Sequence, residues 1–210
     1  MNKQLEQWQG ELGNKYTSDS WSSQGKTSID AWARMLDGLS LSRILEVGCG
    51  HGRHLSALYS LYINQFNDME IVGIDPNRLA LTLAKNREGL FSVLKGNAYD
   101  IPFKDDYFDL VFTCAVLIHI PSERLQEVLK ELYRVSNQYI LTIEPSSDLE
   151  EMKLWRGQED MVWVHDLDRR FKEYLPGLSL VRWGRWDKES GLSGWPALET
   201  TPWRLYKKEG

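Results

Sequence analysis

The sequence has little cysteine, no long apolar run and no recognisable leader. Its 210 residues include only two cysteines, Cys49 and Cys114, which exclude a disulfide-stapled secreted scaffold and show no metal-ligand spacing. No stretch approaches the roughly 20 apolar residues that cross a bilayer, and the first residues lack the apolar segment of a signal peptide. These absences predict a soluble, cytoplasmic protein with no metal site and no membrane partner.

An excess of basic residues is also missing. The chain has 25 Lys and Arg against 30 Asp and Glu, a formal net charge of −5. Residues 43–150 hold 10 basic and 15 acidic residues, which accounts for the whole surplus. Because proteins that grip nucleic acid through its phosphates carry a basic surface, we expect no nucleic-acid partner. We expect a small-molecule substrate and a monomer or homodimer.

Tryptophan, in contrast, is abundant. The nine tryptophans all lie outside residues 33–154, at Trp8, Trp21, Trp32, Trp155, Trp163, Trp183, Trp186, Trp195 and Trp203. Large flat side chains in the two flanks can exclude water and stack on a ligand, and plain packing explains several of them equally well. The distribution divides the chain into a central part and two aromatic ends.

The central part alternates between apolar runs and helical periodicity. Runs rich in β-branched residues lie at Ile44–Val47, Ile71–Ile74, Phe91–Leu94, Leu110–Phe112 and Tyr139–Ile143. Helical patterns lie at 29–36, 53–63, 77–88, 122–135 and 166–175, whereas 97–107 reads as a loop. Apolar strands that alternate with helices predict an α/β fold, with a mostly parallel sheet covered by helices on both faces.

The end of the chain predicts the closing part of this sheet. Residues 178–186 and 202–206 alternate like two strands, which predicts an antiparallel pair joined by a loop rich in Gly, Ser and Pro. We expect one Rossmann-like domain in three parts. Residues 1–42 cover the pocket, residues 43–145 form the ligand-binding core, and residues 146–210 complete the sheet and the substrate side.

The strongest local signal is a glycine-rich turn. Gly48, Gly50 and Gly52 follow the first apolar run and precede a helical pattern. Glycines at such a turn let the backbone approach a ligand and direct amides of a helix N-terminus at it. Their G-x-G-x-G spacing differs from the G-x-G-x-x-G of dinucleotide-binding folds, which favours another ligand over a nicotinamide dinucleotide.

Polar residues follow the next two predicted strands. Asp75 ends the second strand, where an acid can accept hydrogen bonds from ribose hydroxyls, or can cap the helix that starts after Pro76. Asn97 and Ala98 follow the third strand, where a side-chain amide beside a small residue can meet an adenine edge. Taken alone, Asn97 is equally a turn residue.

These motifs together resemble the class I S-adenosylmethionine-dependent methyltransferases. The resemblance covers about residues 43–145 and runs through Leu45–Gly52, Gly73–Asp75, Gly96–Ala98 and residues 103–111. It implies S-adenosylmethionine as the cofactor, with the glycines and Glu46 near its methionine part, Asp75 at the ribose, and Asn97 and Ala98 at the adenine. The candidate cofactor-binding residues are Glu46, Gly48, Cys49, Gly50, His51, Gly52, Asp75, Pro76, Asn97, Ala98 and Cys114.

The two flanks resemble a narrower group, the methyltransferases associated with pseudaminic acid biosynthesis. This similarity rests on Trp8–Tyr16, Trp155–Gly157, His165–Asp166 and Thr201–Lys208. It implies a small polar acceptor such as a sugar or a nucleotide-sugar derivative.

Several residues are candidates for the acceptor side. His119 follows the fourth strand, where the acceptor is expected. It either acts as a base or substrate-positioning group, or it caps the next helix or lies wedged under a loop. His51 either contacts the cofactor or shapes the glycine turn, while Cys49 and Cys114 also suit plain packing. Candidate substrate-binding residues are Trp8, Tyr16, Trp21, Glu144 and His165.

The sequence leaves several functions open. A small-molecule methyltransferase is the first hypothesis, and an RNA or protein methyltransferase is its alternative. A nicotinamide-dependent oxidoreductase is disfavoured by the glycine spacing. A non-catalytic cofactor-binding or scaffold protein is the alternative from another class.

Overall fold

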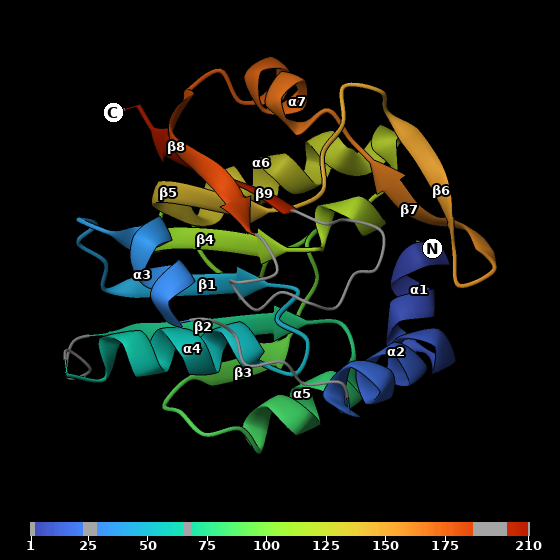
Figure 1. The fold of residues 1–210 in the computed structure, drawn as a ribbon, viewed down its shortest axis with the longest axis horizontal. Coiled ribbons are helices and arrows are strands. Elements are labelled where there is room, and N and C mark those ends of the chain that lie inside the picture. The colour runs from blue at the N-terminus through green and yellow to red at the C-terminus, as the bar shows by residue number, and fades with distance from the viewer. Residues whose placement is uncertain (1–2, 23–28, 65–68, 187–200, 210) are drawn as a thin grey trace.

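The computed structural model describes residues 3–22, 29–64, 69–186 and 201–209. Within these residues seven strands form one sheet, in the order β3 (Ser92–Lys95), β2 (Glu70–Asp75), β1 (Arg43–Val47), β4 (Phe108–Cys114), β5 (Ser136–Ile143), β9 (Thr201–Lys208) and β8 (Leu178–Trp186). Strands β1 to β5 are parallel, whereas β9 pairs antiparallel with both β5 and β8. The mostly parallel sheet with an antiparallel pair, predicted from the sequence, is therefore confirmed (Figure 1).

Helices cover both faces of the sheet. On one face lie α3 (Ile29–Leu36) and α4 (Arg53–Tyr62), and on the other lie α6 (Leu125–Val135) and α7 (Leu167–Tyr174) (Figure 1). Alternate residues of a strand point to opposite faces. Leu45 therefore belongs to the core beneath α6, and Ile44 belongs to the core beneath α3. This double burial explains why the central strands are almost continuously apolar.

The strand order creates a crevice at one edge of the sheet. Strand β1 pairs with β2 on one side and with β4 on the other, so the chain changes direction across the sheet at this point. In open α/β sheets such a switch point separates the loops that leave the carboxyl ends of the two neighbouring strands. The glycine turn, Asp75 and Cys114 all come from these ends.

The remaining predicted elements compare closely with the structure. Helix α5 (Arg78–Lys85) follows β2, a 3-10 turn at Ser122–Arg124 precedes α6, and the stretch between β3 and β4 is irregular apart from a bridge between Asn97 and Asp100. The predicted loop between β8 and β9 lies outside the described residues at 187–200. No described helix is both long and apolar enough to cross a bilayer.

Two segments contain helices or strands that the sequence did not predict. The polar N-terminal segment forms α1 (Lys3–Gln9) and α2 (Glu11–Ser22), and the mixed segment after β5 contains a hairpin of β6 (Glu151–Trp155) and β7 (Gln158–Val164). Helix α2 combines Gly, Asn, Thr and Ser, which are weak helix formers. Tertiary contacts, rather than local propensity, therefore hold these elements over the carboxyl edge of the sheet.

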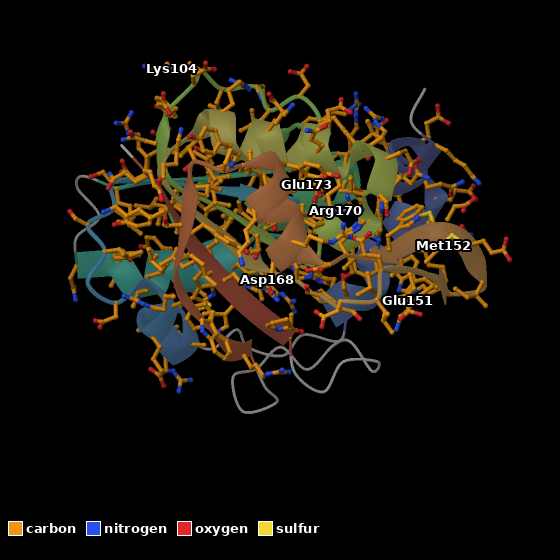
Figure 2. The ribbon with its side chains drawn as sticks, turned by 90° about the horizontal axis from the view of Figure 1, so that it is seen from above. Lys104, Glu151, Met152, Asp168, Arg170 and Glu173 are labelled. Carbon is orange, nitrogen blue, oxygen red and sulfur yellow. The ribbon has the colours of Figure 1, made fainter. Side chains whose placement is uncertain are left out.

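One ion pair anchors the start of the hairpin to α7. The Nε and Nη2 atoms of Arg170 donate to the two carboxylate oxygens of Glu150 over 2.8 and 2.7 Å. This pairing lowers the pKa of Glu150 to about 2. Figure 2 labels Arg170 on α7, and Glu151 and Met152 at the beginning of β6.

Trp32 and Trp183 differ most clearly in burial among the tryptophans described. Trp32 on α3 is fully buried, with its ring centroid 4.9 Å from that of Phe112, whereas the side chain of Trp183 is 69% exposed. Trp32→Ala should lower the free energy of unfolding by about 3–5 kcal/mol because it leaves a large cavity, and Trp183→Ala by less than about 0.5 kcal/mol. Urea unfolding measures both values, and equal losses would contradict this packing.

Candidate active site

The glycine turn after β1 adopts a backbone that favours glycine. Gly48, Gly50 and Gly52 have φ angles of +76°, +51° and +75°, a region that other residues rarely occupy. A Cβ atom on Gly48 would lie 2.4 Å from Cγ2 of Val116. The N–H groups of Gly48 and Cys49 donate to the Ile74 carbonyl over 2.8 and 3.0 Å, which fixes the turn against β2.

The carboxylate of Asp75 holds this turn in place. Its Oδ2 accepts the Gly50 N–H over 2.8 Å, and its Oδ1 accepts the Asn77 N–H over 2.8 Å. Burial raises the pKa of Asp75 to about 6, although both hydrogen bonds oppose the rise. Asn77, and not Asp75, is the N-cap of α5, because its Oδ1 accepts the Ala80 N–H.

Glu46 is a second buried acid beside the turn. Only 1% of its surface is exposed, and within the described chain neither carboxylate oxygen has a hydrogen-bond partner. Burial raises the pKa of Glu46 well above its usual range, the Arg53 charge opposes this rise, and the Asp75 charge adds to it. Burying a carboxylate without a hydrogen-bond partner costs free energy. Such a group is expected where a cationic ligand binds and supplies the missing partner.

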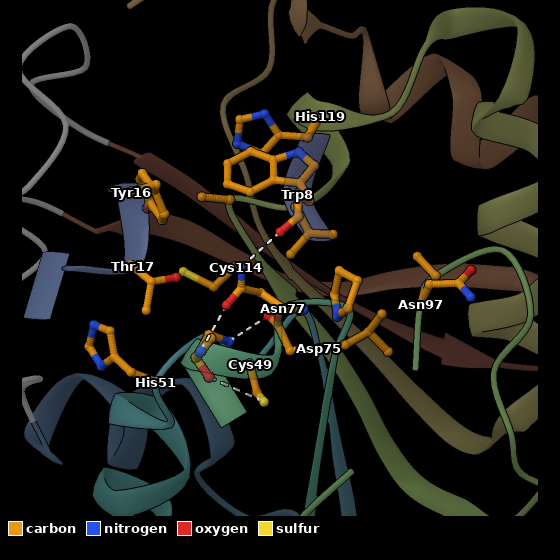
Figure 3. A pocket seen from close by; sticks show the side chains of 18 of the residues that line it. Trp8, Tyr16, Thr17, Cys49, His51, Asp75, Asn77, Asn97, Cys114 and His119 are labelled. Carbon is orange, nitrogen blue, oxygen red and sulfur yellow. Dashed lines mark hydrogen bonds between the residues drawn. The ribbon is translucent and has the colours of Figure 1, made fainter. Parts of the chain in front are cut away.

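A cavity of about 440 Å³ opens at this edge of the sheet (Figure 3). Most of the residues singled out from the sequence line it, namely Trp8, Tyr16, Glu46, Gly48, Cys49, Gly50, His51, Asp75, Pro76, Asn97, Ala98, Cys114 and His119. Asn97 also forms the local turn foreseen as its alternative, because its Oδ1 accepts the Tyr99 N–H over 2.8 Å. These residues come from separate strand ends and from the N-terminal helices, and the fold gathers them around one space.

Gly52 and Trp21 do not line the cavity. Gly52 precedes α4, and a Cβ atom there would lie 3.1 Å from Cβ of Ala84, so it serves the packing of α4 against α5. The Trp21 ring lies edge-on to the His51 ring at 5.5 Å, with the Arg87 guanidinium 4.9 Å from its centroid. Trp21 therefore contacts His51, which lines the cavity, without lining the cavity itself.

His51 itself is fixed by Arg87. The Nη2 group of Arg87 lies 2.8 Å from Nδ1 of His51, and its Nε donates to the His51 carbonyl over 2.6 Å. Burial and the Arg87 charge lower the pKa of His51 to about 4. The ring is therefore neutral at pH 7 and accepts a hydrogen bond at Nδ1.

Glu144 and His165 are also placed behind the cavity lining, contrary to the substrate contacts expected for them. Glu144 Oε1 accepts the Val116 N–H over 2.9 Å. His165 Nε2 lies 3.2 and 2.9 Å from the carbonyls of Leu117 and Ile120. Both side chains satisfy backbone groups of the loop that carries His119, because that loop folds over them.

His119 has a fixed tautomer. Its Nδ1–H donates to the Met161 carbonyl over 2.7 Å, which leaves Nε2 as the unprotonated nitrogen of the neutral ring. Burial lowers the pKa of His119 to about 4. His119 does not cap the following helical turn, whose N-cap is Pro121 without a side-chain hydrogen bond.

Trp8 and Trp155 contact the His119 ring, and Tyr16 packs against both tryptophans; we call these three side chains the aromatic wall. The Trp8 ring lies 4.5 Å from the His119 ring, 5.4 Å from the Tyr16 ring and 5.7 Å from the Trp155 ring, measured between centroids. Trp8 and Tyr16 come from α1 and α2, and Trp155 comes from the β6–β7 hairpin. Sequence reasoning did not assign Trp155 or its neighbour Arg156 to the site, although the Trp-Arg-Gly turn was a visible signal.

Neither cysteine is a nucleophile. Cys49 and Cys114 are free thiols, and burial raises the pKa of both above its usual range, so both stay protonated. No group of three His, Cys, Asp or Glu side chains within the described part of the chain has the geometry to hold a metal ion.

Comparison with known proteins agrees with this geometry. Residues 45–138 match a family model described as a methyltransferase domain. A curated relative, a phthiotriol/phenolphthiotriol dimycocerosates methyltransferase of Mycobacterium ulcerans, is 31% identical over 117 residues, which are 54% of this chain and 42% of that protein. The chain thus aligns with less than half of the length of the curated relatives found.

Two solved structures share the fold over most of the chain. A methyltransferase of Methanosarcina mazei has a TM-score of 0.65 at 19% identity and covers 84% of this chain and 97% of its own. The 1,6-didemethyltoxoflavin-N1-methyltransferase of Burkholderia thailandensis has a TM-score of 0.66 at 11% identity and covers 95% of this chain and 85% of its own.

Residues 45–138 are similar to a methyltransferase domain. The fold is shared with solved S-adenosylmethionine-dependent methyltransferases, the class that the sequence motifs resemble. None of these relatives is described as a pseudaminic acid methyltransferase, so the narrower resemblance of the flanks gains no support. The similarity to a methyltransferase domain agrees with the glycine spacing, which disfavoured a nicotinamide dinucleotide.

The cofactor of this class is S-adenosylmethionine, and the residues around the cavity fit it. The unpartnered Glu46 carboxylate matches the ammonium group of the methionine part of the cofactor. The glycine turn leaves space for the rest of this methionine part. The Asp75 oxygens, each with one hydrogen bond from the backbone, retain lone pairs for two ribose hydroxyls.

The pKa of Asp75 predicts how binding depends on pH. Above pH 6 the carboxylate is charged and accepts two hydrogen bonds from a ribose, whereas below pH 6 it is protonated. Asp75 should therefore make the affinity for S-adenosylhomocysteine about tenfold weaker at pH 5 than at pH 7, in addition to any contribution from Glu46. Asp75→Asn should bind more weakly at pH 7 and show a pH dependence about tenfold smaller than that of the wild type. Calorimetry at both pH values tests this, and an equal pH dependence in the two proteins would contradict it.

Proposed function

We propose that this protein transfers the methyl group of S-adenosylmethionine to a small polar acceptor. The observation that carries the proposal is one continuous cavity with two different halves. The unpartnered carboxylate of Glu46 and the carboxylate of Asp75 line one half, and Trp8, Tyr16 and neutral His119 line the other, with Trp155 packed against them. The first half suits a cationic nucleoside, and the second suits an acceptor beside it.

The acceptor half supplies position and a dry environment. When bound, the cofactor supplies an electrophilic methyl group on a positively charged sulfur. Trp8, Tyr16 and Trp155 enclose the neighbouring space with apolar rings and exclude water from it. Holding an acceptor in line with such a methyl group accounts for as much as about 7–11 kcal/mol of a barrier.

Neutral His119 supplies the acid–base part. With Nδ1–H bound to Met161, its Nε2 is the nitrogen that accepts a hydrogen bond or a proton from a hydroxyl or ammonium. Its low pKa keeps the ring neutral throughout the physiological range, so the accepting form is always present. A general base is needed where the acceptor atom loses a proton on methylation.

The side chains of the acceptor half of the cavity favour a polar acceptor that contains a ring. Aromatic faces stack on flat or C–H-rich ring surfaces, and the Arg156 guanidinium and Asp19 carboxylate, 2.6 Å apart, add polar groups at the cavity. The sugar-like acceptor suggested by the flanks fits this combination. The net charge of −5 disfavours an RNA substrate. Observed turnover with any acceptor would exclude a non-catalytic scaffold protein.

A labelled-methyl screen tests the acceptor class. Protein and S-adenosylmethionine with a labelled methyl group are incubated with nucleotide-sugar pools, polar cell extract, lipid extract, RNA and protein. We expect label in low-mass polar compounds. Label confined to lipid, RNA or protein would overturn the polar acceptor, and the absence of transfer to every fraction would favour the scaffold alternative.

His119→Asn separates the acid–base role from packing. The asparagine amide can still donate to the Met161 carbonyl, but it has no group in place of Nε2. We expect kcat to fall by about 10²-fold or more for a hydroxyl or ammonium acceptor, with the affinity for S-adenosylhomocysteine changed less than about twofold. Unchanged turnover would remove His119 from the mechanism.

A further inference from the structure

The side chain of Asn77 joins the cofactor half of the cavity to the aromatic wall. Only 3% of Asn77 is exposed. Its backbone N–H donates to Asp75 over 2.8 Å, and its Oδ1 accepts the Ala80 N–H over 2.8 Å. Its Nδ2 group donates to the Trp8 carbonyl over 2.9 Å (Figure 3). The same group donates to Oδ1 of Asn14 over 3.0 Å. One buried amide therefore connects β2, α5, α1 and α2.

Gly13 shows how closely these segments approach one another. A Cβ atom at Gly13 would lie 1.9 Å from the Trp8 carbonyl oxygen and 2.8 Å from Nδ2 of Asn77. Gly13 lies within α2, so a side chain is excluded there by the neighbouring atoms and not by the backbone conformation. The contact between Asn77 and the end of α1 thus depends on a glycine in α2.

The opposite side of the N-terminal helices is held more weakly. There Arg156 of the hairpin pairs with Asp19 of α2, and their side chains are 38% and 43% exposed. Exposed ion pairs contribute little to stability, whereas removing one partner of a buried hydrogen bond leaves the other unsatisfied at a larger cost. The buried connection through Asn77 therefore fixes the main chain at Trp8, while the Trp8 ring packs against His119, Tyr16 and Trp155.

The connection continues to the site proposed for the ribose. Asp75 accepts hydrogen bonds from both Gly50 and Asn77, one on each oxygen. A ligand that binds these oxygens stabilises the same carboxylate geometry that orients Asn77. Successive hydrogen bonds thus join the glycine turn to Asp75, Asp75 to Asn77, and Asn77 to Trp8.

We infer that Asn77 is a positioning residue that couples occupation of the cofactor site to the placement of the aromatic wall. The inference rests on the proposed function, because it takes Asp75 as the ribose ligand. Cofactor binding then stabilises α1 and α2 over the cavity and raises the affinity for the acceptor. By linkage, a bound acceptor raises the affinity for the cofactor by the same factor.

Asn77→Ser isolates this role. Serine is as good an N-cap as asparagine, so it keeps the hydrogen bond from Ala80, but its shorter side chain lacks the Nδ2 group that donates to both Trp8 and Asn14. Gly13→Ala is an independent variant, because alanine favours helix but its Cβ separates α1 from Asn77. Ser18→Ala, at an exposed position of α2, is the matched control.

Hydrogen exchange of residues 3–22 with and without S-adenosylhomocysteine measures the coupling. In the wild type and in Ser18→Ala we expect the ligand to slow exchange in this segment about tenfold. In Asn77→Ser and Gly13→Ala we expect the ligand to bind and to protect the glycine turn, but to change exchange in residues 3–22 less than about twofold. A merely structural role would raise exchange equally with and without ligand and leave the ratio unchanged.

The outcomes separate the inference from the proposed function. Equal ligand-dependent protection of residues 3–22 in the wild type and both variants would overturn the role of Asn77, as would binding to the wild type without protection of this segment. Failure of S-adenosylhomocysteine to bind the wild type in calorimetry would instead overturn the cofactor assignment. With an acceptor in hand, the two variants should raise its KM at least about fivefold and change kcat less.

Discussion

The site depends on one buried carboxylate with two backbone hydrogen bonds. Asp75 fixes the glycine turn through Gly50 and the start of α5 through Asn77. Burying this charge raises its pKa to about 6, which is a cost that the protein carries in the absence of ligand. In the proposed function the same carboxylate binds the ribose, so one residue would both organise the turn and recognise the ligand. The cavity, the N-terminal helices and the aromatic wall are all positioned relative to it.

The tryptophans divide between packing and the site. Trp32 is part of the core beneath the sheet, whereas Trp8 and Trp155 meet His119 from opposite ends of the chain. Trp21 supports His51 from outside the cavity. In the proposed function the central segment therefore supplies a general cofactor site, and the two flanks supply the wall that would distinguish one acceptor from another. The acidic surplus of the central segment opposes binding of polyanions.

Much of the fold was predictable because it depends on local patterns. Apolar runs marked β1 to β5, and the residues at their carboxyl ends, such as Gly48, Asp75 and Asn97, necessarily meet at one edge of a parallel sheet. Helix α2 was not predictable, since its polar sequence becomes helical through contacts such as that of Gly13 with Trp8. Glu144 and His165 were expected in the pocket, but the loop between them and the cavity uses both side chains to satisfy its own backbone. Such burial of a strand-end acid depends on the loop's path, which local sequence does not specify.

The central claim is that Glu46 and Asp75 form a cofactor site for S-adenosylmethionine. Calorimetry of S-adenosylhomocysteine binding at pH 7, in buffers of different ionisation enthalpy, tests it most directly. Burial raises the pKa of Glu46, and a ligand ammonium lowers it again, so binding to the wild type should release protons. Glu46→Gln should bind at least about tenfold more weakly and release fewer protons. Absence of binding to the wild type, or equal affinity and equal proton release in both proteins, would contradict the account.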